Sequence, residues 1–280
     1  MKAQTARAQT GGARPIKVPL FAFLALACLA LPALNCLAQA APDDPVTLLR
    51  RQIGLDNAAP NQTNPQGLRI QFQKVESAHL ADAHAVRYRL LVPGAPESET
   101  YTLAVWRIGT QVAYTPGQIY TNARGLLMWH LPKRKQQDKD SLSSADEVEV
   151  ELKAARGEPV RYMLANADGK LFIPGTIVPY PLESRQGNCR LEARLGMPDG
   201  QGLLVYIDGL APGAAVPLES ESQGEKHAPA VTADAKGHAV ALVDPTIAGT
   251  NAGVVKISVA TKGCSVSVEV PWGEGSYHPM

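Results

Sequence analysis

Short stretches in which apolar and polar residues alternate recur along most of the chain after position 66. The runs Leu68 to Phe72, Val86 to Leu90, Val148 to Leu152 and Val266 to Val270 all alternate in this way. A period of two puts every second side chain on the same face of a strand, so one face is buried and the other is wet. This pattern is typical of antiparallel sheets, and many short strands of this kind indicate a sandwich or a barrel.

One short segment near the N-terminus has the signals of a helix. Asp44 fits the N-cap, Pro45 fits the first helical position, and Gly54 fits the residue that ends the helix. The stretch 57–66, rich in Asn, Pro, Gln and Thr, has the composition of a linker. We therefore expect residues 41–65 to form a short helix followed by a linker.

Two turn sequences occur twice in the same order. Pro93-Gly94-Ala95 has a counterpart in Pro212-Gly213-Ala214, and Asn122-Ala123-Arg124-Gly125 has one in Asp234-Ala235-Lys236-Gly237. Strand-like segments flank the turns in matching order. The matched segments are 68–75 with 189–195, 147–154 with 254–261, and 160–164 with 266–270. We interpret this order as a duplication, with the extra polar insert 133–140 in the first copy. Ordinary turn chemistry that recurs by chance is the alternative.

The second copy has room for seven strands. They are expected near 189–195, 203–209, 214–221, 226–232, 237–243, 253–260 and 264–271. Seven short strands with regular turns are the immunoglobulin-like number. Over residues 66–273 the chain resembles the immunoglobulin-like modules that occur in tandem in bacterial secreted and surface proteins. No specific protein or enzyme family is identified by this resemblance.

The resemblance implies an all-β chain of two tandem immunoglobulin-like antiparallel β-sandwiches. We expect the first sandwich at 66–175 and the second at 189–273. A proline-rich linker at 176–188 would separate them, and a tail at 274–280 would follow. In an alternative arrangement, the segment 177–180 forms the closing strand of the first sandwich.

The first forty residues have the layout of a secretory signal peptide. Residues 1–17 carry four basic side chains and no acidic one, and an apolar run at 18–34 follows. Prolines interrupt this run, which disfavours a membrane-spanning helix, and Ala38-Gln39-Ala40 fits the small-x-small cleavage pattern. We expect cleavage after Ala40 and a secreted or periplasmic mature protein that meets the membrane only through this signal. A membrane anchor or a lipoprotein is the alternative.

Removal of residues 1–40 changes the charge and the cysteine count. The whole chain has 27 basic and 26 acidic residues, and loss of four basic residues leaves 23 against 26, a net charge of −3. With no basic excess, nucleic-acid binding is excluded. Cys189 and Cys264 are then the remaining thiols, and in an oxidising compartment they are expected to form a disulfide. In the chain-entropy picture, closing this loop stabilises the fold by about 4 to 5 kcal/mol.

Motifs that carry chemistry are missing from the sequence. It contains no nucleophile elbow, no zinc-protease helix motif and no glycine-rich phosphate loop. His227 and His238 could meet across a hairpin, but no further ligand completes a zinc site. Asp199-Gly200 looks like part of a calcium loop, although Asp-Gly is also the favoured hairpin turn. We therefore expect no catalytic residue, no metal and no cofactor.

Aromatic residues gather at the C-terminal end of the chain. Trp272, Tyr277 and His278 form the possible ligand-contact group, and the alternative role for Trp272 is to cap the core of the second sandwich. Trp106 and Trp129 lie in apolar runs and are expected in the core.

These observations favour an exported, non-catalytic binding or spacer protein of the cell envelope, whose partner is an unknown protein or an envelope polymer. One alternative is a carbohydrate-active or other envelope-polymer enzyme without a recognisable motif. Its carboxylates could come from Glu147, Glu149 and Glu151, which share one wet strand face, although solvation alone explains that pattern. The other alternative is a sugar-binding β-sandwich module.

Overall fold

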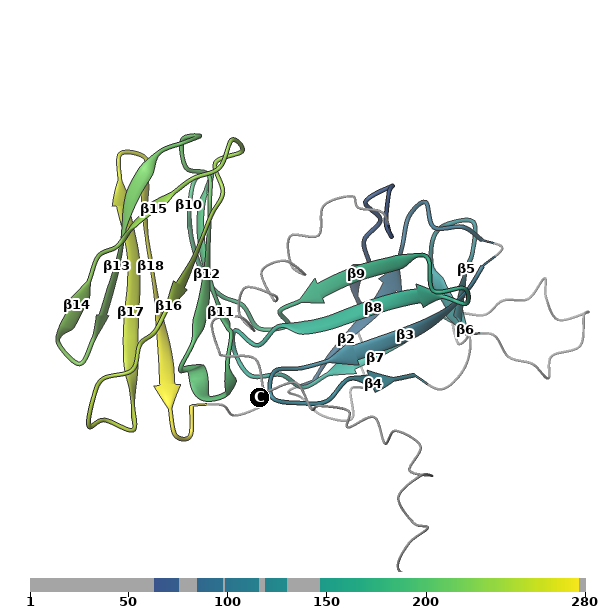
Figure 1. Ribbon diagram of the computed structural model, residues 1–280, viewed down its shortest axis with the longest axis horizontal. Coiled ribbons are helices and arrows are strands. Elements are labelled where there is room, and N and C mark those ends of the chain that lie inside the picture. The colour runs from purple at the N-terminus through teal and green to yellow at the C-terminus, as the bar shows by residue number, and fades with distance from the viewer. Residues whose placement is uncertain (1–62, 76–84, 98, 116–118, 130–146, 277–280) are drawn as a thin grey trace, which may run out of the picture. The chain divides into compact units, whose positions relative to one another are not determined.

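The structure is a computed structural model that describes residues 63–75, 85–97, 99–115, 119–129 and 147–276. The expected signal peptide, N-terminal helix and polar insert, together with Tyr277 and His278, lie outside these residues. All described residues belong to one compact unit of the chain. The described part is built almost entirely from antiparallel strands, as the alternating pattern predicts (Figure 1).

Two sheets form the first half of the described chain. The three-stranded sheet has the order β1-β2-β7, with β1 at Gln71–Val75, β2 at Val86–Leu91 and β7 at Glu149–Leu152. The second sheet has the order β6-β5-β3-β8-β9, with β4 paired to β3. Its strands are β3 (Thr100–Trp106), β4 (Ala113–Tyr114), β5 (Ile119–Thr121), β6 (Leu127–Trp129), β8 (Val160–Asn166) and β9 (Phe172–Ile177). Buried residues of both sheets, such as Leu90 and Leu103, form one hydrophobic cluster.

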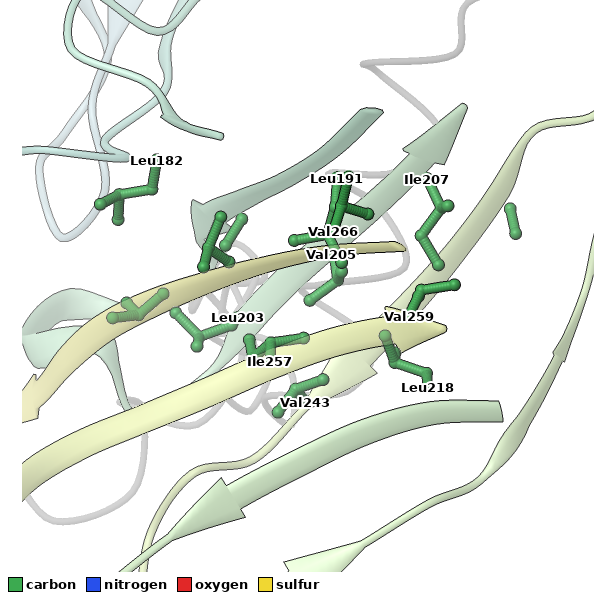
Figure 2. Packing of buried hydrophobic residues seen from close by; sticks show 14 of the residues in the cluster. Leu182, Leu191, Leu203, Val205, Ile207, Leu218, Val243, Ile257, Val259 and Val266 are labelled. Atoms are coloured by element: carbon green, nitrogen blue, oxygen red, sulfur yellow. The ribbon is translucent and has the colours of Figure 1, made fainter. Parts of the chain in front are cut away.

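Two further sheets form the second half. The first has the order β10-β11-β12-β16, and the second has the order β14-β13-β17-β18 with β15 paired to β13. The first sheet contains β10 (Leu182–Gln186), β11 (Cys189–Leu195), β12 (Leu203–Asp208) and β16 (Ala239–Val243). The second contains β13 (Ala215–Ser222), β14 (Glu225–His227), β15 (Ala230–Thr232), β17 (Ala252–Thr261) and β18 (Cys264–Gly273). Leu191, Val205 and Val266 pack together in the core of this half (Figure 2).

Alternation of side chains explains how these strands bury a core. Along β13 exposed and buried residues alternate over the whole strand, so Val216 and Leu218 face the core while Glu219 and Glu221 face solvent. The strand β18 alternates in the same way until Trp272. Burial of one such valine or leucine side chain contributes about 1.5 to 3 kcal/mol. The hydrophobic clusters therefore supply most of the driving force for folding.

The segment between the two halves differs from the expected linker. Residues 182–186 form β10, which pairs with β11, and β9 extends to Ile177, two residues past the expected boundary. Gly187, with φ of 57°, makes the tight turn that folds β10 back onto β11. β10 lies at the edge of its sheet, and so its sequence is polar. For this reason the sequence does not predict it as a strand.

The two halves share the order of their strands. The order β1-β2-β7 corresponds to β11-β12-β16, and β3-β8-β9 corresponds to β13-β17-β18. The expected pairing of 68–75 with 189–195 agrees with this order. The two pairings after the turns do not, because β7 corresponds to β16 and β8 to β17. The expected pairings matched β7 with β17 and β8 with β18, one strand too far along the second half. The insert before β7 obscures the place of β7 in the order.

The repeated turns have the same hydrogen bonds. Oδ1 of Asn122 accepts from the backbone N–H of Arg124 and Leu126 at 2.9 and 3.1 Å. Oδ1 of Asp234 accepts from the N–H of Lys236 and His238 at 2.7 and 2.9 Å. A glycine with positive φ closes each turn, and a Cβ atom on Gly237 would lie 2.3 Å from a backbone oxygen of Leu210. The turn sequence is therefore a structural requirement in both halves.

The expected disulfide between Cys189 and Cys264 is present, with 5.4 Å between the two Cα atoms. It joins β11 to β18, and so it ties together the two sheets of the second half. Next to it, the N–H of Ser265 donates to Oε1 of Gln186 at 2.6 Å. The disulfide therefore fastens the end of the second half at which β18 begins.

Candidate functional site

The face of the sheet β3-β8-β9 that points away from the core of the first half carries several apolar side chains, beside Thr102 and Arg161. Strand pairing places Tyr114 beside Ala104, with Met163 on the other side of Ala104. In the next row Ala165 pairs with Phe172. The side chain of Tyr114 is 70% exposed and that of Phe172 is 37% exposed. Two large apolar side chains, one on β4 and one on β9, thus meet solvent on the same face of this sheet.

Trp106 belongs to the same outer face. Tyr101, Leu103 and Val105 point into the core cluster, so Trp106, the next residue in the alternation, points away from it. The expectation that Trp106 is a core residue is therefore wrong, although the side chain is half-buried. Trp129 does pack against the core cluster. We call the surface formed by Ala104, Trp106, Tyr114, Met163, Ala165 and Phe172 the apolar sheet face.

The corresponding face of the second half is mostly polar. On β13-β17-β18 the outward residues include Glu219, Glu221, Lys256, Ser267 and Glu269, together with the exposed apolar residues Val254 and Pro271. The outer faces of the two corresponding sheets therefore differ in their share of charged side chains. Because the fold tolerates a polar face at this place, the apolar sheet face is not required for folding.

The outer face of β1-β2-β7 carries a ladder of ion pairs. Arg87 donates to Glu151 at 3.1 Å, Arg89 lies 3.4 Å from Glu149, and Arg89 also contacts Glu147. The three glutamates do share one strand face, as their alternation predicts. Solvation alone does not explain them, because each carboxylate is paired with a guanidinium on the neighbouring strand. The geometry is that of cross-strand ion pairs.

A second ladder lies on the outer face of β10-β11-β12. The carboxylate of Glu192 is buried between Arg190, at 2.6 Å, and Arg194, at 2.9 Å. Arg194 also stacks 4.2 Å above the ring of Tyr206. Hydrogen bonds from Arg185 and then Arg190 lower the pKa of Glu183. The charged side chains on this face therefore serve as ion-pair and hydrogen-bond partners for one another.

Trp272 lies at a cavity of about 460 Å³ at one end of the second half. The lining residues are Asp199, Gln201, Thr246, Thr250, Asn251, Trp272, Glu274 and Gly275. Trp272 itself is 1% exposed, and its Nε1–H donates to the hydroxyl of Ser222 at 3.0 Å. The indole thus packs in the core and presents no open ring face for stacking. Its role as a ligand contact remains a prediction, with Tyr277 and His278 outside the described residues.

The loops around this cavity are held in place by the backbone. Asp199 has φ of 62°, in the left-handed region, within the 3-10 turn Pro198–Gly200. The hydroxyl of Ser276 lies 2.9 Å from the carbonyl oxygen of Asp199 and 2.7 Å from that of Gly273. A Cβ atom on Gly273 would lie 2.0 Å from a backbone oxygen of Asn251. Asp199-Gly200 therefore shapes a loop between β11 and β12 and is not a two-residue hairpin turn.

A second cavity, of about 500 Å³, lies beside the first repeated turn and is lined mainly by small residues between Gly94 and Gly125. Nearby, the hydroxyls of Thr121 and Tyr101 donate to the carbonyl oxygen of Pro96 at 3.1 and 3.2 Å. Burial, with a smaller effect of Glu99, raises the pKa of Tyr101 to about 12. Tyr101 therefore remains a neutral donor that holds this loop.

The two histidines considered for zinc are not paired. His227 lies on β14 and contacts Glu225, whereas His238 precedes β16 and its Nδ1 lies 2.8 Å from Asp208. In the part of the chain that the structure describes, no three His, Cys, Asp or Glu side chains come together as a metal site. No helix among the same residues is long and apolar enough to cross a membrane.

Comparisons with known proteins give weak similarities. No protein-family model matches the sequence, and no curated protein matches it. One solved structure, a tetra-tandem repeat in the extending region of a large adhesion protein, is 11% identical with a TM-score of 0.22. The match covers 73% of this chain and 48% of that one, so this chain spans about half its length.

Two other solved structures are similar at the same level. Red sea bream transglutaminase is 10% identical with a TM-score of 0.22, over 71% of this chain and 31% of that one. A 1.5-MDa bacterial ice-binding adhesin is 12% identical with a TM-score of 0.19, over 74% and 64% of the two chains. With TM-scores this low, the three resemblances assign neither a fold family nor a function to this chain.

Proposed function

We propose that this chain is an exported, non-catalytic binding protein of the cell envelope, built from two tandem immunoglobulin-like sandwiches. The binding surface in this proposal is the apolar sheet face of the first sandwich, and the partner is a protein with a complementary apolar surface. The observation that carries the proposal is the contrast between this face and the mostly polar face of β13-β17-β18, which has the same place in the strand order.

The composition of the apolar sheet face supports a protein partner. Trp, Tyr, Phe and Met are enriched at the centres of protein interfaces, where burial of their large side chains provides most of the binding energy. Tyr114 and Phe172 expose such side chains to solvent on one face of the sheet. An exposed patch of this kind is characteristic of an interaction site on a soluble domain.

Other observations support the remaining parts of the proposal. The shared strand order and the matching turn hydrogen bonds support a duplicated sandwich. The basic and then apolar layout of residues 1–40 and the Cys189–Cys264 disulfide support export to an oxidising compartment.

The proposal is tested with residues 41–280 produced in oxidised form and immobilised on a sensor surface. Binding to intact cells and to a fractionated cell envelope is measured for the wild-type chain, for Tyr114→Ser with Phe172→Ser, and for the control Val254→Ser. Val254 is also an exposed apolar residue, at 51%, but it lies on β17. We expect the double variant to lose at least tenfold in affinity and the control to bind like the wild type.

Two results would count against the proposal. If no envelope fraction binds the wild-type chain, the spacer role is favoured over the binding role. If the wild-type chain turns over any member of a panel of glycans and envelope polymers, the non-catalytic part of the proposal is wrong.

A further inference from the structure

The strand β4 has one open side. It pairs with β3 through Ala113 and Tyr114, and the described part of the chain places no strand on its other side. Residues 111–114 are all exposed, with Val112 at 48% and Tyr114 at 70%. At β4 the edge of the sheet is therefore in contact with solvent.

The backbone polar groups of Val112 and Tyr114 point away from β3. The N–H of Thr115 donates to the carbonyl oxygen of Leu103 at 2.9 Å, so the backbone groups of Thr115 face β3. In an antiparallel pair this direction alternates from one residue to the next, so Ala113 faces β3 while Tyr114 and Val112 face outward. Among the described residues, the outward N–H and C=O groups have no hydrogen-bond partner.

We infer that this edge binds an extended segment of the partner protein, which joins the sheet as an added strand. Outward N–H and C=O groups at every second residue match the backbone of another extended chain. A helix offers no such match, because its backbone groups are paired within the helix. The inference rests on the function proposed above and states how the partner would be held.

The side chains beside the edge indicate which segment fits. Tyr114 lies beside Ala104 in the pairing register. The next pair in the same register places Val112 beside Trp106, so both exposed side chains belong to the outer face of the sheet. Residues 108–115 contain no charged side chain and no proline. Since an added strand presents every second side chain on this face, a neutral segment with apolar residues at alternate positions fits the edge.

Several other sheet edges are protected from pairing. At β9 the carbonyl oxygen of Pro174 accepts from the N–H of Ile70 at 2.9 Å. At β18 the N–H of Ser265 donates to Gln186, and Pro271 has no N–H to donate. The edge strand β14 carries charged side chains at exposed positions. Charges, prolines and covering contacts are common protections of strand edges, and none of the three is present at β4 among the described residues.

The edge strand β16 gives the most demanding comparison. It also lacks charged side chains, but Leu242 is the exposed member of its five residues. Residues 111–114, in contrast, are exposed without exception. The combination of an uncharged sequence with exposed backbone therefore distinguishes β4 from β16.

The edge is ordered before a partner arrives. In the turn before β4, the N–H of Arg107 donates to the hydroxyl of Thr110 at 3.1 Å, and the N–H of Thr110 donates to the carbonyl of Arg107 at 3.2 Å. After β4, the hydroxyl of Thr115 donates to the carbonyl of Leu103 at 3.1 Å. Because both ends of the strand are held in this way, little conformational entropy is lost when a segment binds.

The test uses isotopically labelled residues 41–280 with the disulfide formed, and follows backbone amide signals in solution. The probe is the peptide acetyl-Lys-Val-Thr-Val-Thr-Val-Lys-amide, in which the lysines provide solubility. Two further forms of the peptide carry N-methyl groups either on every valine or on every threonine. We expect the unmethylated peptide to bind in a saturable way and to shift signals of residues 111–115.

The methylated peptides test for backbone pairing. N-methylation of alternate residues removes the N–H groups along one edge of a strand, so one of the two forms should bind about tenfold more weakly or worse. Loss of binding by the valine-methylated form would show that the peptide runs antiparallel to β4. Loss by the threonine-methylated form would show that it runs parallel.

A matched pair of variants tests the backbone of the protein itself. Val112→Pro removes the outward N–H and leaves the hydrogen bonds to β3 in place, since proline is tolerated in edge strands. Val112→Thr retains the N–H and the branched shape of the side chain. We expect Val112→Pro to bind the unmethylated peptide about fivefold more weakly than Val112→Thr, or worse. Amide spectra of the free variants establish that both fold like the wild type.

Four results would overturn the inference. They are no saturable binding of the unmethylated peptide, equal affinity of the three peptides, equal affinity of the two Val112 variants, and shifts that map away from β4. A wild-type dimer seen by sedimentation and absent in Val112→Pro would place a second copy of this chain at the edge, and would overturn the assignment to a partner.

The strand addition and the proposed function can fail separately. If the envelope-binding experiment succeeds and the peptide titration fails, the apolar sheet face binds its partner without an added strand. If the titration succeeds and no envelope fraction binds, the edge accepts an extended segment and the assignment of the partner to the cell envelope is wrong.

Discussion

The two halves of the described chain share their strand order and their Asx turns but differ in how they are fastened and in what they present to solvent. The second half has a disulfide between its sheets and a mostly polar outer face on β13-β17-β18. The first half has no disulfide among its described residues, and it has the apolar sheet face. Features common to both halves are therefore requirements of the fold, whereas features of one half alone point to stability under particular conditions or to binding.

The largest expected effect is on the disulfide. Replacement of both Cys189 and Cys264 by serine, or addition of reductant, should destabilise the second half by about 4 to 5 kcal/mol, because the unfolded chain is no longer closed into a loop. The first half has no such bond among its described residues and should unfold at an unchanged temperature. Calorimetry with and without reductant measures this. A shift of both transitions by the same amount would show that the halves unfold together.

The second-largest expected effect is on the free energy of unfolding of the first half. Glu158 is fully buried, and its carboxylate accepts from Nε and an Nη atom of Arg107, both at 2.6 Å. Glu158→Ala removes the acceptor of these donors and of the N–H of Ala155, and a buried donor left without its acceptor costs about 1 to 3 kcal/mol. Denaturant unfolding should reveal this loss, and Glu97→Gln, at an exposed site, should not. A loss below about 1 kcal/mol would contradict it.

A smaller effect tests the repeated turns. Asp234→Ala should lower the free energy of unfolding slightly, since two backbone N–H groups lose their acceptor. Asp234→Asn should retain the stability, because Asn122 already fills this role in the first half. If Asp234→Asn is as unstable as Asp234→Ala, the two turns are not equivalent.

The stability that Asp234 contributes to this turn depends on pH. Hydrogen bonds from the N–H groups of His238 and Lys236 lower the pKa of Asp234 below its ordinary value of 3.8. A lowered folded pKa means that the contribution of Asp234 is complete above that ordinary value and is lost as the pH falls through the folded pKa. Urea unfolding between about pH 2 and 6 should therefore show a shallower acid dependence for Asp234→Asn than for the wild type, and equal slopes would contradict this assignment.

The smallest effect is on the apolar sheet face. Tyr114→Ser should change the free energy of unfolding by less than about 0.5 kcal/mol, because the side chain is 70% exposed. A larger loss, measured in the same denaturant assay, would mean that this face stabilises the first half and would remove the basis of its proposed role in binding.

Local patterns predicted much of the fold. The alternation of residues gives β2, β7 and β18 directly, and the cysteine count gives the disulfide. The strand β10 was missed because an edge strand with a polar sequence resembles a linker. Trp106 was misplaced because a run of apolar residues does not reveal which of its members face the core.

The candidate sites depended on information that the sequence lacks. The apolar sheet face becomes visible only when strand pairing brings Tyr114, Ala104 and Met163 into one row. The cavity combines loops that are about 75 residues apart in sequence, since Ser276 contacts Asp199 at a separation of 77. The sequence analysis named Trp272 at this end of the fold. It did not predict the acidic residues that line the cavity.

The disulfide also limits how far the protein can be stretched. Cys189 and Cys264 are separated by 75 residues, and a pulled chain extends by at most about 3.5 Å per residue, so the bond withholds about 260 Å of contour length. Under tension applied at the two chain ends, the segment that closes the loop cannot lengthen while the bond is intact. Reduction of one covalent bond would therefore change the mechanical reach of the protein by many times the length of a single strand.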